Sequence, residues 1–383
     1  MKRTQLFPVL IIFLAVINSY AQEVPETKHI TLPNGWGISC VGESFRLGDL
    51  PLNIAVSNSG RLIAVTNNGQ SDQSIYLIDA MARKVLDTIV IKEAWLGLAF
   101  SKDEKTLYVS GGNQNLIYKY SIKNNRLALA DSLVLGKPWP NRISPSGMAL
   151  NEKKNLLYVV TKENNSLYIL DMTKKQANIR FSLEGEGYSC TLSGDSRSLY
   201  ISCWGCGKVQ VFNTETRKFV TSIKVGSNPN DLCLSKNGKY LYVANANDNS
   251  VSCIDVTAGR VIETLNSALY PDSPAGSTTN SVALSADNKT LYIANADNNC
   301  LAVFDVSTPG KSFSKGFIPT GWYPCCVRVV NKQVWVANGK GFTSAANPGG
   351  PNPAVKAQKV QTQQGDSRKP PKASISQDCS GEP

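Results

Sequence analysis

The chain has 383 residues and a formal net charge of +11, from 40 Lys and Arg residues against 29 Asp and Glu residues. The basic residues are dispersed, with no run of five, so the charge favours a solvated basic surface and argues against a nucleic-acid partner. The single histidine, His29, argues against Ser-His-Asp or Cys-His catalysis and against axial haem ligation.

The first 21 residues have the pattern of a secretory signal peptide. Two basic residues precede an apolar run of 12 residues from Leu6 to Ile17, and the small-residue site Ser19-Tyr20-Ala21 follows. The run is too short to span a bilayer, and no other stretch reaches the necessary length. We therefore expect cleavage after Ala21, a periplasmic or secreted mature chain, and no membrane span.

A fifteen-residue phrase occurs twice, as LYVANANDNSVSCID at 241–255 and LYIANADNNCLAVFD at 291–305. Each copy contains four short segments with period-2 alternation, separated by Gly or Asn turns, which predicts a four-stranded antiparallel sheet. Sheets of about 42 residues that repeat along a chain are typical of propeller blades. The sequence predicts an all-β, seven-bladed propeller from seven anchors on the second strands: Ala64, Tyr108, Tyr158, Tyr200, Tyr242, Tyr292 and Trp335.

The regions flanking the repeats suggest how the ring closes. Residues 22–46 are expected to form an N-terminal segment, and the alternating stretch from Ile38 to Leu47 could supply a ring-closing strand. The propeller itself is predicted at 47–342. Residues 343–383 are polar and rich in Pro, Gly and Lys, which predicts a disordered tail. No third strand is evident for the last blade, so we expect that blade to be incomplete.

The repeat resembles a known family. The run P-x-x-L-x-L-S-x-x-G-K-x-L-Y-V-A-N from Pro229 to Asn245, with V-x-x-I-D ending at Asp255, is similar to the YVTN-repeat propellers. Segments 47–57, 64–79 and 319–329 resemble a bacterial subgroup in which the propeller precedes a phosphoesterase domain of the alkaline-phosphatase superfamily. The resemblance implies a propeller associated with a phosphoesterase. No such domain follows residue 342, so the end is expected to be truncated or frame-shifted.

Residues that recur in most blades are interpreted as structural. The recurrent Tyr is expected to fill the space between blades. A recurrent Asn at the end of the second strand is expected to hydrogen-bond neighbouring backbone amides in the turn that follows. It occurs at Asn67, Asn245, Asn295 and Asn338.

Ten cysteines in an exported chain predict at most one or two disulfides at this chain length. Cys203 and Cys206 have the C-x-x-C spacing of redox and zinc sites, but a second such pair is missing. Cys190, Cys325 and Cys326 lie at neighbouring strand starts and could converge. No cofactor is expected, and a metal site at Cys203 and Cys206 stays a minor alternative.

Ligands of propellers usually meet the mouth of the central channel. The start of each innermost strand carries a small or polar residue, termed here a ring residue: Asn53, Gly97, Gly147, Ser189, Asp231, Ser281 and Cys326. Neighbouring loops carry aromatic residues and an arginine, which suit recognition of a ligand or peptide. The predicted ligand-binding residues are Asn53, Trp95, Trp139, Arg142, Tyr188, Trp204, Asp231, Trp322 and Tyr323.

Three function classes remain open from the sequence. The first is an exported, non-enzymatic propeller that binds a small molecule, glycan or protein on its top face, as a free protein or as part of a phosphoesterase. The second is a lactonase-like hydrolase, which is disfavoured because no convergent Glu and Arg set is evident. The third is a structural cell-surface repeat protein.

Overall fold

The computed structural model describes residues 30–32, 35, 37–69, 72–173, 179–341 and 374–378. The predicted signal peptide and His29 lie outside the described residues. Within these ranges, no helix has the length and apolar character needed to cross a membrane.

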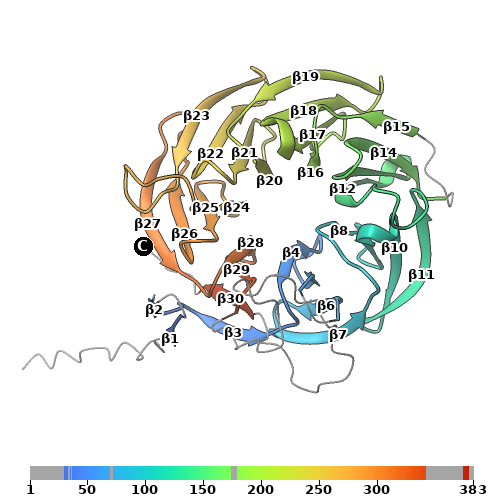
Figure 1. Cartoon of the computed structure of the whole chain (residues 1–383), viewed down its shortest axis with the longest axis horizontal. Coiled ribbons are helices and arrows are strands. Elements are labelled where there is room, and N and C mark those ends of the chain that lie inside the picture. Colours follow the sequence, from blue (N-terminus) through green and yellow to red (C-terminus); the bar gives the residue numbers. More distant parts are fainter. Residues whose placement is uncertain are drawn as a thin grey trace, which may run out of the picture.

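Seven four-stranded antiparallel sheets are arranged as blades around a central axis, which confirms the predicted propeller (Figure 1). The strands of the first four blades have the following bounds. Blade 1 comprises β4 (Pro51–Val56), β5 (Leu62–Asn67), β6 (Ser74–Asp79) and β7 (Lys84–Val90). Blade 2 comprises β8 (Leu98–Phe100), β9 (Thr106–Ser110), β10 (Leu116–Lys123) and β11 (Arg126–Val134). Blade 3 comprises β12 (Pro145–Asn151), β13 (Leu156–Thr161), β14 (Ser166–Asp171) and β15 (Ile179–Ser182). Blade 4 comprises β16 (Gly187–Leu192), β17 (Ser198–Cys203), β18 (Lys208–Asn213) and β19 (Lys218–Lys224).

The remaining blades follow the same order from the axis outward. Blade 5 comprises β20 (Pro229–Leu234), β21 (Tyr240–Asn245), β22 (Ser250–Asp255) and β23 (Arg260–Asn266). Blade 6 comprises β24 (Thr279–Leu284), β25 (Thr290–Asn295), β26 (Cys300–Asp305) and β27 (Phe313–Pro319). Blade 7 comprises β28 (Pro324–Val330), β29 (Gln333–Asn338), β30 (Ser374–Asp378) and β3 (Glu43–Arg46). A small hairpin of β1 (Ile30–Thr31) and β2 (Gly37–Ile38) and three short 3₁₀ turns, η1 (Gly112–Gln114), η2 (Glu152–Lys154) and η3 (Trp204–Cys206), complete the described elements.

Blade 7 is assembled from three distant segments of the chain. Strand β30 pairs with β29, and β3, which lies in the 38–47 segment, pairs with the far side of β30 (Figure 1). Ser374–Asp378, within the 343–383 segment, thus supplies blade 7 with a third strand that the sequence did not make evident. Strand pairing uses backbone N–H and C=O groups, so an open strand edge can take up a polar segment that has little apolar surface of its own.

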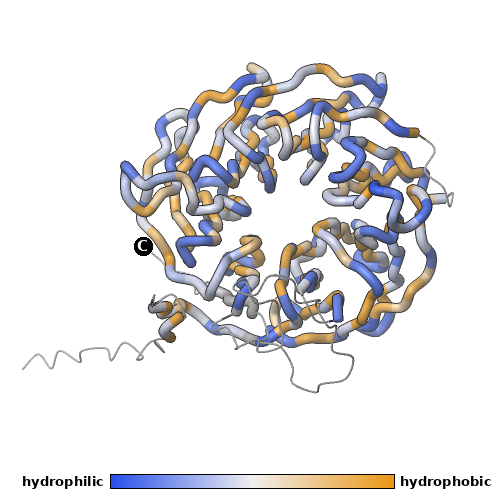
Figure 2. The backbone as a smooth tube through the Cα atoms, viewed as in Figure 1, coloured by the Kyte–Doolittle hydropathy of each residue, from blue (hydrophilic) through white to orange (hydrophobic). Residues whose placement is uncertain are grey.

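The hydrophobic core lies between adjacent blades, since each second strand is covered on both faces. Tyr242 on β21, for example, packs in one cluster with Ile293 and Phe304 of the next blade. Trp335 takes the place of the recurrent Tyr in blade 7 and packs with Ile54 and Ile63 of blade 1, so this cluster closes the ring. Figure 2 shows both hydrophobic and hydrophilic stretches in every blade of the ring.

The recurrent Asn side chains lie in this core, at the ends of the second strands. Asn245 donates its amide N–H groups to Ser250 Oγ at 3.0 Å and Ser252 Oγ at 2.9 Å, and Asn295 donates to the Ser267 carbonyl at 2.5 Å. These side chains therefore act as donors, whereas the sequence predicted acceptors of backbone amides. The Oδ1 atoms of Asn245 and Asn295 are buried and accept no hydrogen bond from the described residues.

Candidate functional site

The seven predicted ring residues all line one cavity of about 320 Å³ on the propeller axis. Six innermost strands carry a register irregularity beside their first residues, such as that between Pro51 and Asn53 in β4 and that between Pro324 and Cys326 in β28. An irregularity of this kind bends the strand locally and redirects the side chain that follows. The ring therefore arises from a repeated local distortion at the channel mouth.

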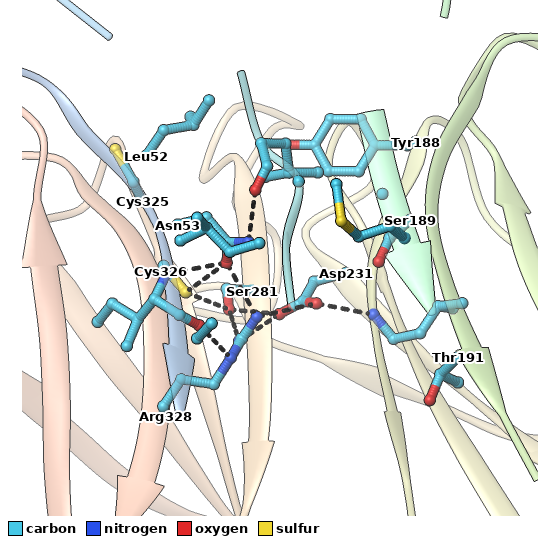
Figure 3. A pocket seen from close by; sticks show the side chains of 18 of the residues that line it. Leu52, Asn53, Tyr188, Ser189, Thr191, Asp231, Ser281, Cys325, Cys326 and Arg328 are labelled. Carbon is cyan, nitrogen blue, oxygen red and sulfur yellow. Dashed lines mark hydrogen bonds and ion pairs between the residues drawn. The ribbon is translucent and has the colours of Figure 1, made fainter. Parts of the chain in front are cut away.

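Arg328, on β28, is the centre of a charged network in this channel cavity (Figure 3). Its Nη1 lies 2.7 Å from Asp231 Oδ2 and donates to Ser281 Oγ at 3.0 Å. Its Nη2 donates to Asn53 Oδ1 at 3.2 Å, and its Nε donates to the Ile54 carbonyl at 3.1 Å. These partners belong to blades 5, 6 and 1, so one guanidinium fastens four blades together.

Both charges of this network are satisfied within the protein. Ser281 donates its hydroxyl to Asp231 Oδ2 at 2.6 Å, and the Leu232 N–H donates to Asp231 Oδ1 at 3.1 Å. Burial is the largest single influence and lowers the pKa of Arg328, but the charge and hydrogen bond of Asp231 and the nearby Cys326 and Cys233 together raise it by more, so the net shift is upward and the guanidinium stays charged. The sequence showed no convergent Glu and Arg set, and the structure places an Asp and an Arg together in the channel instead, because Arg328 and Asp231 meet only after the ring closes.

The thiols of the channel cavity are buried and protonated. Cys190, Cys325 and Cys326 line it together, as the sequence suggested. Burial raises the pKa of the Cys325 thiol to about 12 and raises the pKa values of the Cys190 and Cys326 thiols as well. Thiolates are the reactive and metal-binding form, so these groups are poor nucleophiles. In the described ranges, no three His, Cys, Asp or Glu side chains are placed to hold a metal ion.

The C-x-x-C pair occupies the junction of β17 and η3. Cys203 is buried and donates to Gln210 Oε1 at 3.2 Å, while Cys206 donates to the Cys203 carbonyl at 3.7 Å. Burial raises the pKa of both thiols. All nine cysteines of the described residues are free, so the pair forms no disulfide in this structure.

A second cavity of about 230 Å³ lies beside the channel, and we call it the mouth cleft. Trp95, in the loop before β8, and Trp204, in η3, form part of its wall. The Lys162 ammonium lies 5.8 Å from the Trp95 ring centroid and 6.0 Å from the Trp204 ring centroid. The cleft draws residues from blades 2 to 6: Trp95, Lys162, Glu186, Gly187, Tyr188, Trp204, Asn230, Ala246, Asn247, Thr278 and Asn280.

Three polar atoms in the walls of the mouth cleft are buried without a hydrogen-bond partner in the described structure. They are the indole N–H of Trp95, Oε2 of Glu186 and Oδ1 of Asn230. Asn230 is only 3% exposed and donates its amide to Asn280 Oδ1 at 3.2 Å. Buried polar groups are nearly always paired in folded proteins, so three such atoms around one cavity indicate a place for a partner.

The other predicted aromatic residues form two separate groups on neighbouring loops. Lys340 lies 5.3 Å from the Trp322 ring centroid and 4.3 Å from that of Tyr323. The Arg142 guanidinium lies 5.1 Å from the ring centroid of Trp139, which is 54% exposed. None of these residues lines the channel cavity or the mouth cleft.

The predicted site residues thus divide between two adjoining cavities. Asn53 and Asp231 line the channel cavity, Trp95 and Trp204 line the mouth cleft, and Tyr188 lies between them and borders both. Sequence reasoning missed the polar residues beside them, which are Arg328, Lys162, Glu186 and Asn230, and it missed that Ser281 hydrogen-bonds to both members of the Arg328–Asp231 ion pair. The one available signal was that these positions differ in type from blade to blade, as the aromatic residues do.

Comparisons with known proteins agree on the fold. A family model described as Lactonase, 7-bladed beta-propeller, matches residues 188–329. Antigen Lp49 of Leptospira interrogans serogroup Icterohaemorrhagiae serovar copenhageni (strain Fiocruz L1-130) is 28% identical over 107 residues, which cover 26% of this chain and 24% of the antigen. The chain therefore matches about a quarter of the length of that curated relative.

Solved structures give the same architecture at low identity. A chain of Kuenenia stuttgartiensis Hydrazine Synthase superposes with a TM-score of 0.64 at 17% identity, covering 77% of this chain and 94% of that one. The U3-55K structure and the RRP9 WD40 repeats each give a TM-score of 0.67 at 12% identity and cover 88% of this chain, with 98% and 99% of their own lengths matched. Similarity at this level shows the propeller fold alone.

Proposed function

We propose that this chain is an exported, non-enzymatic β-propeller that binds a ligand at the mouth cleft. One observation carries the proposal: the charges of the channel cavity are satisfied internally, whereas the mouth cleft keeps three buried polar atoms without partners. The polar groups of the Arg328 network already bond to one another across the blades, so they are not available to a ligand. A cavity with unpaired polar atoms and aromatic walls has the character of a recognition site.

Catalysis in the channel has little support from the residues that line it. The Arg328 and Asp231 groups already bond each other and their neighbours, and the channel thiols are protonated. A general base or nucleophile must be free to reach a substrate proton or carbon. Among the channel-lining residues that the structure describes, no other carboxylate or imidazole is present.

A lactonase-like hydrolase is the second candidate, favoured by one observation. The family model described as a lactonase matches residues 188–329, a stretch that contains Asp231 and Arg328. In this alternative Arg328 would polarise a lactone carbonyl, and Asp231 would act on the attacking water. Arg328 and Asp231 would then have to break their present hydrogen bonds and bind the substrate instead.

We also propose, from the sequence, that the chain is exported and that it associates with a phosphoesterase. The basic, apolar and small-residue order of residues 1–21 supports export. The resemblance of segments 47–57, 64–79 and 319–329 to phosphoesterase-linked propellers supports a partnership with a phosphoesterase. Terminal sequencing of the exported protein tests the first point, because export with cleavage leaves Gln22 as the first residue.

A thermal-shift screen of residues 22–383 separates the candidate functions. The probes are sugars, lactones, phosphoesters and peptides, and a ligand that binds the folded state raises the melting midpoint as its concentration increases. The binding proposal expects a shift that Glu186→Gln reduces and Arg328→Met retains. Lactone hydrolysis that Arg328→Met abolishes would support the hydrolase instead. The absence of any shift or turnover would contradict both and favour a structural role.

A further inference from the structure

Extending the proposed function, on which this inference rests, we infer that the mouth cleft binds a saccharide ring. The first argument is its walls. Trp95 and Trp204 border one cavity, and the Lys162 ammonium lies within 6.0 Å of both ring centroids, so the two indoles lie near one another at the same cavity. Indole rings present broad apolar faces with a polar N–H at the edge. The C–H face of a sugar ring stacks on such a surface while its hydroxyl groups stay at the rim.

The second argument is the set of unpartnered polar atoms. Glu186 Oε2 and Asn230 Oδ1 are acceptors that need a donor, and the Trp95 indole N–H is a donor that needs an acceptor. A hydroxyl group supplies both functions, and several hydroxyls on one ring can supply both at different positions. Small rotamer adjustments of the kind common on binding would bring these buried atoms into contact with a ligand.

Other ligand classes satisfy fewer of these groups. An apolar ligand would leave all three polar atoms unpaired and would gain no hydrogen bond from them. A cationic ligand would pair with Glu186 but not with the Trp95 N–H, and it would be repelled by the Lys162 ammonium, for which the described residues provide no carboxylate partner.

The size of the mouth cleft also limits the ligand. Its volume of about 230 Å³ lies below the roughly 300–1,000 Å³ of cavities that hold drug-sized molecules. One six-membered ring, either a free monosaccharide or the end of a longer glycan, fits this limit. A folded peptide segment does not.

Saturation-transfer NMR on residues 22–383 tests the inference. The probes are glucose, galactose, mannose, N-acetylglucosamine, glucuronate and cellobiose, with tetramethylammonium as the cationic probe and a glycan array for longer chains. We expect at least one saccharide to bind saturably. Glu186→Gln, which removes the charge and keeps the shape, is expected to weaken binding by about tenfold, since hydrogen bonds to charged groups are the strong ones.

Variants of the aromatic wall show where a bound saccharide lies. Trp204→Ala is expected to abolish binding. Trp204→Phe is expected to bind more tightly than Trp204→Ala, because it keeps an aromatic face on which a sugar ring can stack. Tyr270→Ala changes an aromatic residue that is 57% exposed and borders neither cavity, so it serves as the control. The melting midpoint of each variant shows whether a loss of binding reflects a loss of folding.

The outcomes distinguish this inference from the proposed function. Saccharide binding that survives Glu186→Gln and Trp204→Ala would overturn the mouth cleft as the sugar site. Binding of tetramethylammonium at the cleft, without any saccharide, would overturn the ligand class and leave the binding function standing. No binding by any probe on the array or in solution would overturn both.

Discussion

Replacing Arg328 with Met should destabilise the whole ring, because this side chain fastens four blades. The substitution removes the ion pair to Asp231 at 2.7 Å and the hydrogen bonds to Asn53, Ser281 and Ile54. Breaking a buried pair by removing one partner typically costs about 3–5 kcal/mol. Asp231 keeps its Ser281 hydroxyl, and the two side chains are 25% and 13% exposed, so we take the lower end, about 3 kcal/mol. At roughly 2 °C per kcal/mol for a chain of this size, the melting midpoint falls by about 6 °C.

Thermal unfolding followed by calorimetry measures this effect, and Arg197→Met is the matched control. Arg197 pairs with Glu215 at 3.6 Å, but the side chains are 67% and 52% exposed, so its loss should change the midpoint by little. The double variant Arg328→Met, Asp231→Leu should be less destabilised than the sum of the single variants, since neither charge is left alone. If the Arg328→Met and Arg197→Met variants have the same melting midpoint, the Arg328 network does not stabilise the ring and the reasoning fails.

Three further outcomes follow from the packing and the thiols. Gly226→Ala should destabilise by about 1–3 kcal/mol, because a Cβ there would lie 2.6 Å from Cγ of Asn245, whereas Gly194→Ala, with open space around it, should be neutral in the same denaturant titration. Burial raises the pKa of the Cys253 and Cys300 thiols to about 12, above the unfolded value of 9.0, so their contribution to stability is complete below pH about 9 and is lost as the pH rises toward 12. Urea unfolding at pH about 8 and about 10.5 should show this loss, and a flat profile would contradict it. Alkylation followed by mass spectrometry should modify the nine described cysteines fully once the chain is unfolded without reductant, and a protected pair would reveal a disulfide.

The blades and the ring residues could be predicted because both depend on local pattern. Alternation with period 2 gives the strands, and seven copies give the number of blades, so the start of each innermost strand could be aligned from copy to copy. The Arg328 network could not be predicted in this way. Its members are separated by up to 275 residues, and the sequence does not say which blades face one another across the channel. Ser374–Asp378 was missed for a related reason, because backbone pairing with an open edge leaves little trace in composition.

The position that precedes each ring residue explains why the mouth cleft lies on one side of the channel. The ring residues are small or polar, whereas the residue before each one ranges from Ser to Leu and Tyr. It is Leu52 in blade 1, Leu96 in blade 2, Ser146 in blade 3 and Cys325 in blade 7, and it is Tyr188, Asn230 and Asn280 in blades 4, 5 and 6, where it lines the mouth cleft. The mouth cleft adjoins the polar set, and Figure 3 shows Leu52 and Tyr188 on opposite sides of the channel cavity. A repeat fold can therefore place a single binding site without altering the ring, since the residue type at this one position differs from blade to blade.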